Sequence, residues 1–191
     1  MRSLLFPLLK LVSHGRKSVF HHGGRSGLAG AFLIALVVVG CPGTASATYS
    51  IVACDRTGSC GAAVATNNLA VGASVISAQA GVGAVASQFE TNPFYGPRAL
   101  TRLQAGMDAE AVVRWLLETD GDFDGQDTRY RQVAVVGLQG DGFAYTGSEA
   151  QASPWAGALA GPGFSIQGNG LRSEAVVEAM RGAFLAHEGG L

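Results

Sequence analysis

The feature that most constrains the fold is a pair of apolar segments, at residues 69–76 and 81–87. Both are rich in valine and alanine, and glycines interrupt them. A strand with one face in water shows a polar residue at every second position, whereas a strand covered on both faces is nearly continuous in its apolar character. We therefore predict that these segments are strands of a sheet with a layer of structure over each face.

Short β-branched and apolar runs between turn residues predict the other strands, which are 49–53, 61–66, 130–138, 142–146 and 161–168. The first two form a hairpin around Thr57-Gly58, and 130–138 pairs with 142–146 in a second hairpin.

Three helix starts follow from residue type. Pro97 suits the first position of a helix, Asp108 suits the N-cap of a second, and Ser173 suits the N-cap of a last helix over residues 174–187. Strands, helices, strands and a final helix in this order predict an α+β layered sandwich rather than alternating βαβ units.

The N-terminal part of the chain has the pattern of an export signal. Residues 28–40 are an apolar run behind a basic region, shorter than the roughly 20 residues that span a membrane. Ala45-Ser46-Ala47 is a small-x-small cleavage site. We predict a signal peptide with a long basic n-region at residues 1–47 and a periplasmic or secreted domain at residues 48–191. The alternatives are an uncleaved anchor and a lipoprotein cut at Cys41.

Cleavage after Ala47 would leave Thr48 as the first residue, with a hydroxyl and a free α-amine on one residue. The unperturbed pKa of an α-amine is about 7.7–8.0, so near neutral pH part of it is unprotonated and can accept the hydroxyl proton. Thr48 is therefore a candidate catalytic nucleophile that carries its own base. The plain alternative is a threonine that signal peptidase exposes by coincidence.

Export also bears on Cys54 and Cys60, which flank the turn of the first predicted hairpin. Two cysteines left in an oxidising compartment can pair across such a turn. We predict a disulfide between them, and the alternative is two small buried thiols.

Charge is divided unevenly along the chain. All fourteen acidic residues lie in 48–191 with eight arginines and no lysine, which gives this part a formal charge of −6. A nucleic-acid partner would need a basic face, so the balance argues against one. His187 is the one histidine after the leader, so neither a Ser-His-Asp triad nor a Cys/His metal site is expected.

The acidic segment 120–127 imitates the start of an EF-hand calcium loop. Its twelfth position, where a bidentate glutamate belongs, is Arg131. We therefore expect a solvated acidic loop here, with no metal and no cofactor.

Eight ordered segments of the chain resemble one bacterial family: 48–53, 65–72, 78–86, 91–98, 131–133, 146–147, 155–157 and 163–169. Among them are Thr91-Asn-Pro-Phe-Tyr-Gly-Pro-Arg98 and Gly163-Phe-Ser-Ile-Gln-Gly-Asn169. They are similar to domain-of-unknown-function family 1028, a group described as Ntn-hydrolase-like. The resemblance, which runs from Thr48 to roughly His187, implies a four-layer α-β-β-α sandwich of the N-terminal-nucleophile hydrolase type. The family pattern continues past residue 191 with another helix and a final strand, so it also implies a C-terminally truncated domain.

An N-terminal nucleophile needs donors for the oxyanion and groups that hold the substrate. Gln79, Asn92 and Asn169 are amide candidates for the oxyanion, although each suits a turn or sheet amide equally well. Arg98 is a candidate for binding a substrate carboxylate, and Tyr95 for lining a pocket. The plain alternative for Arg98 is a solvated arginine in the first turn of a helix.

Together these features predict an exported N-terminal-threonine amidohydrolase that acts on a small-molecule or peptide amide. The alternative is a secreted or envelope-associated binding protein that keeps the fold without the chemistry. No nucleic-acid partner and no membrane span after cleavage are expected, and a homo-oligomer is left open.

Overall fold

The computed structural model describes residues 47–191. The predicted leader and the alternative cut at Cys41 lie outside the described residues. Among residues 47–191, no helix is both long and apolar enough to cross a membrane.

Two antiparallel four-stranded sheets form the centre of the domain. The first has the order β2-β1-β8-β7 and the second the order β3-β4-β5-β6. The strands of the first sheet are β1 (Thr48–Cys54), β2 (Cys60–Thr66), β7 (Gly157–Gly161) and β8 (Phe164–Asn169). Those of the second are β3 (Ile76–Gln79), β4 (Gly83–Phe89), β5 (Arg131–Gly137) and β6 (Phe143–Thr146).

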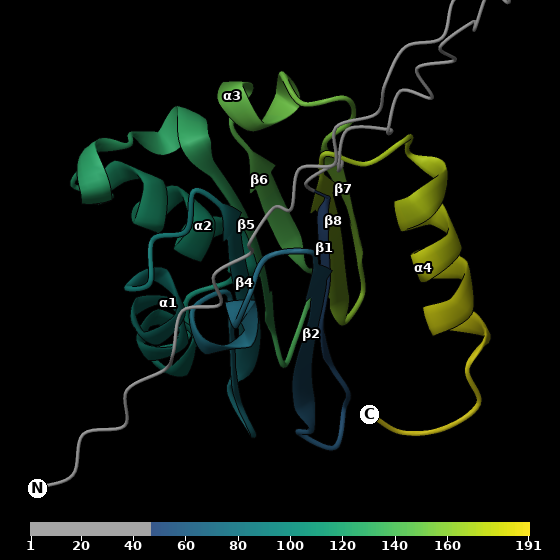
Figure 1. Ribbon diagram of the computed structural model, residues 1–191. Coiled ribbons are helices and arrows are strands. Elements are labelled where there is room, and N and C mark those ends of the chain that lie inside the picture. The colour runs from purple at the N-terminus through teal and green to yellow at the C-terminus, as the bar shows by residue number, and fades with distance from the viewer. Residues whose placement is uncertain (1–46) are drawn as a thin grey trace, which may run out of the picture. The chain divides into compact units, whose positions relative to one another are not determined.

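Helices cover the outer faces of both sheets (Figure 1). Helices α1 (Tyr95–Gln104) and α2 (Ala109–Glu118) pack on β3, β4, β5 and β6, and α4 (Ala175–Ala186) packs on β7 and β8. The short helix α3 (Ser148–Gln151) follows β6 at the end of the sheets where β1 begins. The predicted layered α+β sandwich is thus confirmed, as helix, sheet, sheet and helix.

Side-chain alternation along the strands divides the core into three parts. Val85, Val133 and Val135 face α1 and α2. Their neighbours Ala84, Ala86, Ala134 and Val136 face the first sheet, where they meet Val52. Ile166 and Phe164 face α4 on the far side. Small residues between the sheets let the two backbones approach closely. The predicted burial on both faces is confirmed for β4, and β5 is buried on both faces as well.

Two strand predictions need correction. Residues 69–76 do not form a strand, because Ala70 has a left-handed backbone (φ 56°) and a 3₁₀ turn follows at Val71–Ala73. Leu69 is 96% exposed, and the strand begins only at Ile76. The predicted single strand 161–168 is instead a hairpin of β7 and β8, which turns at Pro162 and Gly163 (φ 76°).

Helix starts were predicted with mixed success. The Asp108 cap of α2 is confirmed, since its carboxylate accepts the N–H of Ala111 at 2.8 Å. Helix α1 begins at Tyr95, before Pro97, because the Asn92 side chain accepts the N–H of Phe94 at 3.1 Å. Helix α4 has Glu174 at its N-cap, where no side-chain cap is made.

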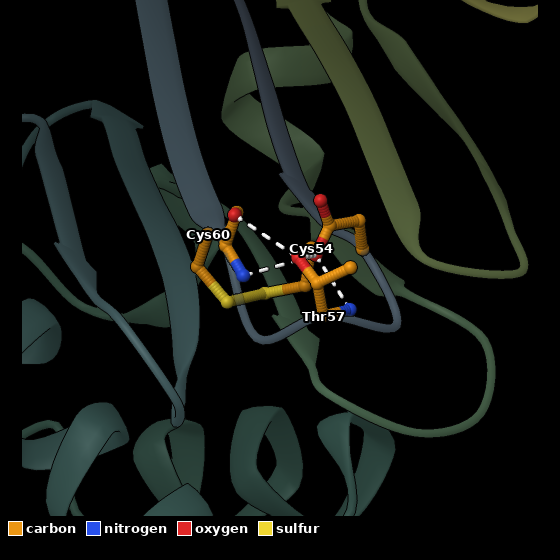
Figure 2. Close-up of a disulfide and its surroundings, with 5 residues drawn as sticks. Cys54, Thr57 and Cys60 are labelled. Carbon is orange, nitrogen blue, oxygen red and sulfur yellow. Dashed lines mark hydrogen bonds between the residues drawn. A yellow bond between two sulfur atoms is a disulfide. The ribbon is translucent and has the colours of Figure 1, made fainter. Parts of the chain in front are cut away.

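Cys54 and Cys60 form the predicted disulfide at the end of the β1–β2 hairpin (Figure 2), with Cα atoms 4.1 Å apart. The Asp55 carboxylate organises the turn by accepting the N–H groups of Thr57 at 2.8 Å and Ser59 at 2.9 Å. The hairpin turn also bonds to the second sheet, because Gly58 O accepts the N–H of Gly81 at 2.8 Å. The β3–β4 turn therefore lies at the disulfide end of the domain.

Candidate active site

Thr48 begins β1, at the end of the strand opposite the disulfide. Its neighbours in register are Thr66 on β2 and Asn169 on β8. Alternation puts its side chain on the same face as Val52, between the two sheets. The residue is 7% exposed. Thr48 is thus held by a strand on each side while its side chain points into the domain.

The hydroxyl oxygens of Thr48 and Thr66 are 2.9 Å apart, so one donates a hydrogen bond to the other. Thr66 Oγ1 also accepts the backbone N–H of Asn68 at 3.3 Å. This second contact fixes the Thr66 side chain, which in turn orients the hydroxyl of Thr48.

A cavity of about 330 Å³ opens beside Thr48. Most of the lining residues lie at the ends of strands or in the loops next to them. The full lining is Thr48, Asn68, Phe89, Glu90, Ser153, Pro154, Asn169 and Gly170. Glu90 is the single charged residue among these described residues. The cavity therefore combines two hydroxyls, from Thr48 and Ser153, with two amide side chains and one carboxylate.

Behind the cavity, buried amide side chains connect the two sheets. Gln132 Oε1 accepts hydrogen bonds from Gln88 Nε2 at 2.8 Å and from Asn169 Nδ2 at 2.9 Å. Gln88 Nε2 also donates to the main-chain oxygen of Thr48 at 3.4 Å. Since Gln88 and Gln132 are almost wholly buried, the network fixes the start of β1 against the second sheet.

The inter-sheet layer is most polar at this end. Three side-chain atoms there, Ser50 Oγ, Gln88 Oε1 and Gln167 Oε1, are buried without a hydrogen-bond partner among the described residues, and Ser165 Oγ, which lies farther along the strands beside Val52, is a fourth. Unsatisfied buried polar atoms reduce stability, and in native proteins each calls for an explanation such as a catalytic role. Their concentration near Thr48 distinguishes this end from the alanine- and valine-filled end.

Of the sequence-predicted site residues, the structure brings Asn169 to Thr48. Asn169 lines the cavity, and only one of its two amide hydrogens is given to Gln132. The second hydrogen suits an oxyanion. Gln79 lies at the end of β3 beside the β3–β4 turn, which is the disulfide end of the domain. The structure therefore separates Gln79 from Thr48 by about the length of a strand, roughly 20 Å.

Asn92 and Tyr95 belong to a buried cluster around Asp120. Both amide hydrogens of Asn92 go to Asp120, to its main-chain oxygen at 3.4 Å and to its carboxylate at 3.2 Å. The Tyr95 hydroxyl also donates to this carboxylate. Asn92 thus has no hydrogen left for an oxyanion, and Tyr95, which is wholly buried, does not line the cavity beside Thr48.

Arg98 lies on the outer surface of the helices. Its guanidinium donates to Thr119 O at 3.1 Å and stacks on Trp115 at 4.6 Å. It holds α1 to α2 and does not reach the cavity beside Thr48.

The acidic segment 120–127 is not simply solvated, which corrects the sequence prediction for Asp120. Arg131 lies inside the loop, where it pairs with Asp120 at 3.0 Å and donates to Phe123 O at 2.9 Å and to Gln126 O. Burial would raise the pKa of Asp120, but the hydrogen bonds from Arg131, Tyr95 and Asn92 hold that pKa below its usual value. The loop therefore encloses an internal cation, Arg131, in the place where an EF-hand holds calcium.

The same arginine supports one wall of the cavity. Arg131 Nη1 donates to Glu90 O at 3.0 Å, and the N–H of Glu90 donates to Tyr130 O at 3.1 Å. Between Glu90 and the rest of β4, Phe89 has φ 68°, a backbone region that a bulky side chain rarely adopts. Such strain persists only where the surroundings enforce it, and it is concentrated at functional sites.

Sequence reasoning missed Thr66, Gln88, Gln132 and Glu90. One signal was present in the chain. Gln88 and Gln132 occupy the positions of β4 and β5 that otherwise carry alanine or valine toward the first sheet. A polar residue that interrupts an inward-facing apolar series indicates a buried network.

A second cavity, of about 700 Å³, lies at the disulfide end beside Cys54, Arg56 and Asp141. It is larger, but its lining among the described residues carries no nucleophilic hydroxyl or free thiol, so the cavity beside Thr48 is the stronger candidate for an active site. Within residues 47–191, no group of three or more His, Cys, Asp or Glu side chains is arranged to hold a metal ion.

Comparison with known proteins supplies a family but no activity. No curated protein matches the chain. The crystal structure of protein SPO2555 from Silicibacter pomeroyi, a DUF1028 protein, superposes with a TM-score of 0.67 and 34% sequence identity. The match covers 75% of this chain and 62% of that one. The model of the family of unknown function DUF1028 matches residues 48–191, so the chain belongs to this family.

Proposed function

We propose that the protein is an exported amidohydrolase whose nucleophile is the N-terminal threonine Thr48, and that its four layers are those of the N-terminal-nucleophile hydrolases. One observation carries the proposal. Thr48 begins a central strand, its hydroxyl is 2.9 Å from that of Thr66, and it opens on a cavity that Asn169 also lines. The family match begins at the same residue, Thr48.

The mechanism follows from the groups around Thr48. Once the Ala47–Thr48 bond is cut, the α-amine takes the hydroxyl proton while Oγ1 attacks the amide carbonyl carbon. The negative charge on the carbonyl oxygen is stabilised by the free amide hydrogen of Asn169 and by the side chain of Asn68. The ammonium then protonates the leaving nitrogen as the carbon–nitrogen bond breaks. Water, deprotonated by the same amine, cleaves the resulting ester and releases the acid.

Export fits this mechanism, because the enzyme that removes the leader also creates the base. The Cys54–Cys60 disulfide supports a periplasmic or secreted location, since such bonds persist in oxidising compartments. Cleavage at Cys41 instead would leave Thr48 inside the chain with a non-basic amide nitrogen.

The test starts with the full chain expressed in an exporting host. Mass spectrometry establishes the first residue of the product, and turnover of a peptide-amide library is then measured. We expect activity in the protein that begins at Thr48, partial activity in Thr48→Ser, and none in Thr48→Ala or in a product that retains Ala47. Thr101→Ala is the matched control, because Thr101 is an exposed threonine of α1 that should not affect turnover.

Two results would count against the proposal. Equal turnover in the Thr48→Ala variant and in the unaltered protein would exclude Thr48 as the nucleophile. Absence of turnover across a broad library, in a product shown to begin at Thr48, would favour a secreted or envelope-associated binding protein that uses the same cavity.

A further inference from the structure

We propose that the cavity beside Thr48 selects amides that carry a positive charge next to the scissile bond, and that Glu90 is the carboxylate that recognises this charge. The inference rests on the proposed function for the scissile amide. It concerns specificity, so it can be tested separately from the identity of the nucleophile.

The first argument is the charge of the cavity. Glu90 is exposed at its rim, and among the described residues its carboxylate takes part in no salt bridge or side-chain hydrogen bond. No arginine lines the cavity, and residues 48–191 contain no lysine. Arg131, which donates to the Glu90 carbonyl oxygen, has its charge paired with Asp120. The α-amine of Thr48 is neutral when it acts as the base in the proposed mechanism, so Glu90 is then the single charge among the lining groups. An anionic substrate would therefore meet an unbalanced negative charge, whereas a cationic one would neutralise it.

The second argument is that Glu90 is fixed more firmly than an ordinary surface residue. Its N–H is bonded to Tyr130 O and its carbonyl oxygen to Arg131 Nη1, so both of its backbone groups are attached to the second sheet. Arg131 in turn is held by Asp120. These bonds fix the Glu90 backbone, so a bound ligand has to order only the glutamate side chain.

The third argument comes from Phe89. This residue lines the cavity next to Glu90 and is 36% exposed. Its left-handed backbone (φ 68°) places an aromatic ring and a carboxylate from consecutive residues on one cavity. Aromatic faces attract ammonium and guanidinium groups, so the pair suits a basic group with an aliphatic stem, such as a lysine or arginine side chain.

The size of the cavity is consistent with such a ligand. About 330 Å³ is at the lower end of the range of small-molecule sites, which suits a dipeptide-sized amide. The chemical class is therefore a short basic peptide or an amide of a diamine, with its charge near the bond that Thr48 attacks.

The experiment compares acetylated dipeptide amides in which lysine, norleucine or glutamate stands on either side of the scissile bond. Turnover is measured with the full chain after export and cleavage before Thr48. We expect kcat/KM for the lysine peptide to exceed that for norleucine about fivefold, the range of a partly exposed ion pair, with glutamate lowest. Glu90→Gln should remove this preference, so that the lysine and norleucine peptides have the same kcat/KM. Glu174→Gln, the same change at an exposed position outside the cavity, should leave the preference unaltered.

A binding measurement keeps the inference testable if no peptide is hydrolysed. Calorimetry with the Thr48→Ala protein should show tighter binding of the lysine peptide than of the norleucine peptide, and Glu90→Gln should abolish the difference. If no peptide is hydrolysed but binding depends on Glu90 in this way, the proposed hydrolase activity is wrong and the proposed recognition of a positive charge by Glu90 stands. If the three peptides are hydrolysed with equal kcat/KM, or if the preference survives Glu90→Gln, the proposed role of Glu90 is wrong and the proposed hydrolase activity stands.

Discussion

Thr48 and Thr66 face each other across β1 and β2, with their hydroxyl oxygens 2.9 Å apart. Thr66 also accepts the N–H of Asn68 through the same oxygen, at 3.3 Å. In the proposed mechanism the Thr48 hydroxyl must point at the substrate carbonyl, and Thr66 is the side chain that fixes its direction. Thr66 is thus a positioning residue, because it acts through Thr48.

We predict that Thr66→Val lowers kcat about 10- to 100-fold with little change in KM, since the isosteric valine keeps the packing and removes the hydrogen bond. Thr66→Ser should restore most of the activity. Steady-state kinetics on a hydrolysed peptide would measure both variants. A kcat for Thr66→Val equal to that of the unaltered protein would show that the contact does not orient the nucleophile.

Local patterns in the sequence predicted the parts of the fold that local interactions decide. The β1–β2 hairpin, its disulfide and the Asp108 cap each depend on residues a few positions apart. Residues 69–76 were mispredicted because an apolar run does not reveal the left-handed backbone at Ala70. The short strand β7 was missed because Gly157–Gly161 has no β-branched residue to indicate it.

The candidate site depends on contacts between residues far apart in the chain. Asn169 was predicted as a site residue and lies beside Thr48. The roles predicted for Asn92 and Tyr95 are wrong because the fold brings Asp120 against both side chains, and both donate hydrogen bonds to its carboxylate. Gln132 meets Asn169 only because the two sheets face each other. Such pairings depend on how the layers pack, and no spacing in the sequence encodes them.

Asp120 should be among the residues on which stability depends most. We predict that Asp120→Asn lowers the free energy of unfolding by about 3–5 kcal/mol at pH 7, because it leaves the Arg131 charge buried without its partner. Denaturant unfolding would measure the loss. Asp127→Asn, which removes one of the two carboxylates that pair with the exposed Arg129, should have a much smaller effect.

The lowered pKa of Asp120 predicts how the stability of the protein depends on pH. Because the pKa of Asp120 is lowered in the folded protein, its contribution is fully present above the usual carboxyl pKa of about 4 and is lost as the pH falls through the lowered value. Unfolding curves between pH 7 and pH 2 should therefore fall less steeply at the acid end for Asp120→Asn than for the unaltered protein. Parallel curves for the two proteins would contradict this assignment.

The disulfide should matter for stability and not for catalysis. The Cys54→Ser, Cys60→Ser double variant should lose about 2 kcal/mol of unfolding free energy, the value expected for a loop this short. Activity at 25 °C should be unchanged, because Cys54 and Thr48 lie at opposite ends of β1. Thiol alkylation before and after reduction provides the control: the exported protein that begins at Thr48 should show no free thiol until it is reduced.

The left-handed backbone at Phe89 predicts a reversal of the usual order of alanine and glycine. In an ordinary strand, glycine is about 0.5–1 kcal/mol less stable than alanine, but at φ 68° an alanine keeps a strain of about 1–2 kcal/mol that glycine lacks. Both substitutions remove the partly exposed phenyl ring, so its lost contacts cancel in the comparison. Phe89→Gly should therefore be more stable than Phe89→Ala by about 1 kcal/mol in denaturant unfolding. Ala63→Gly in the exposed middle of β2 is the control and should destabilise. If Phe89→Gly is instead less stable than Phe89→Ala, as glycine is in the control, the backbone at Phe89 carries no strain.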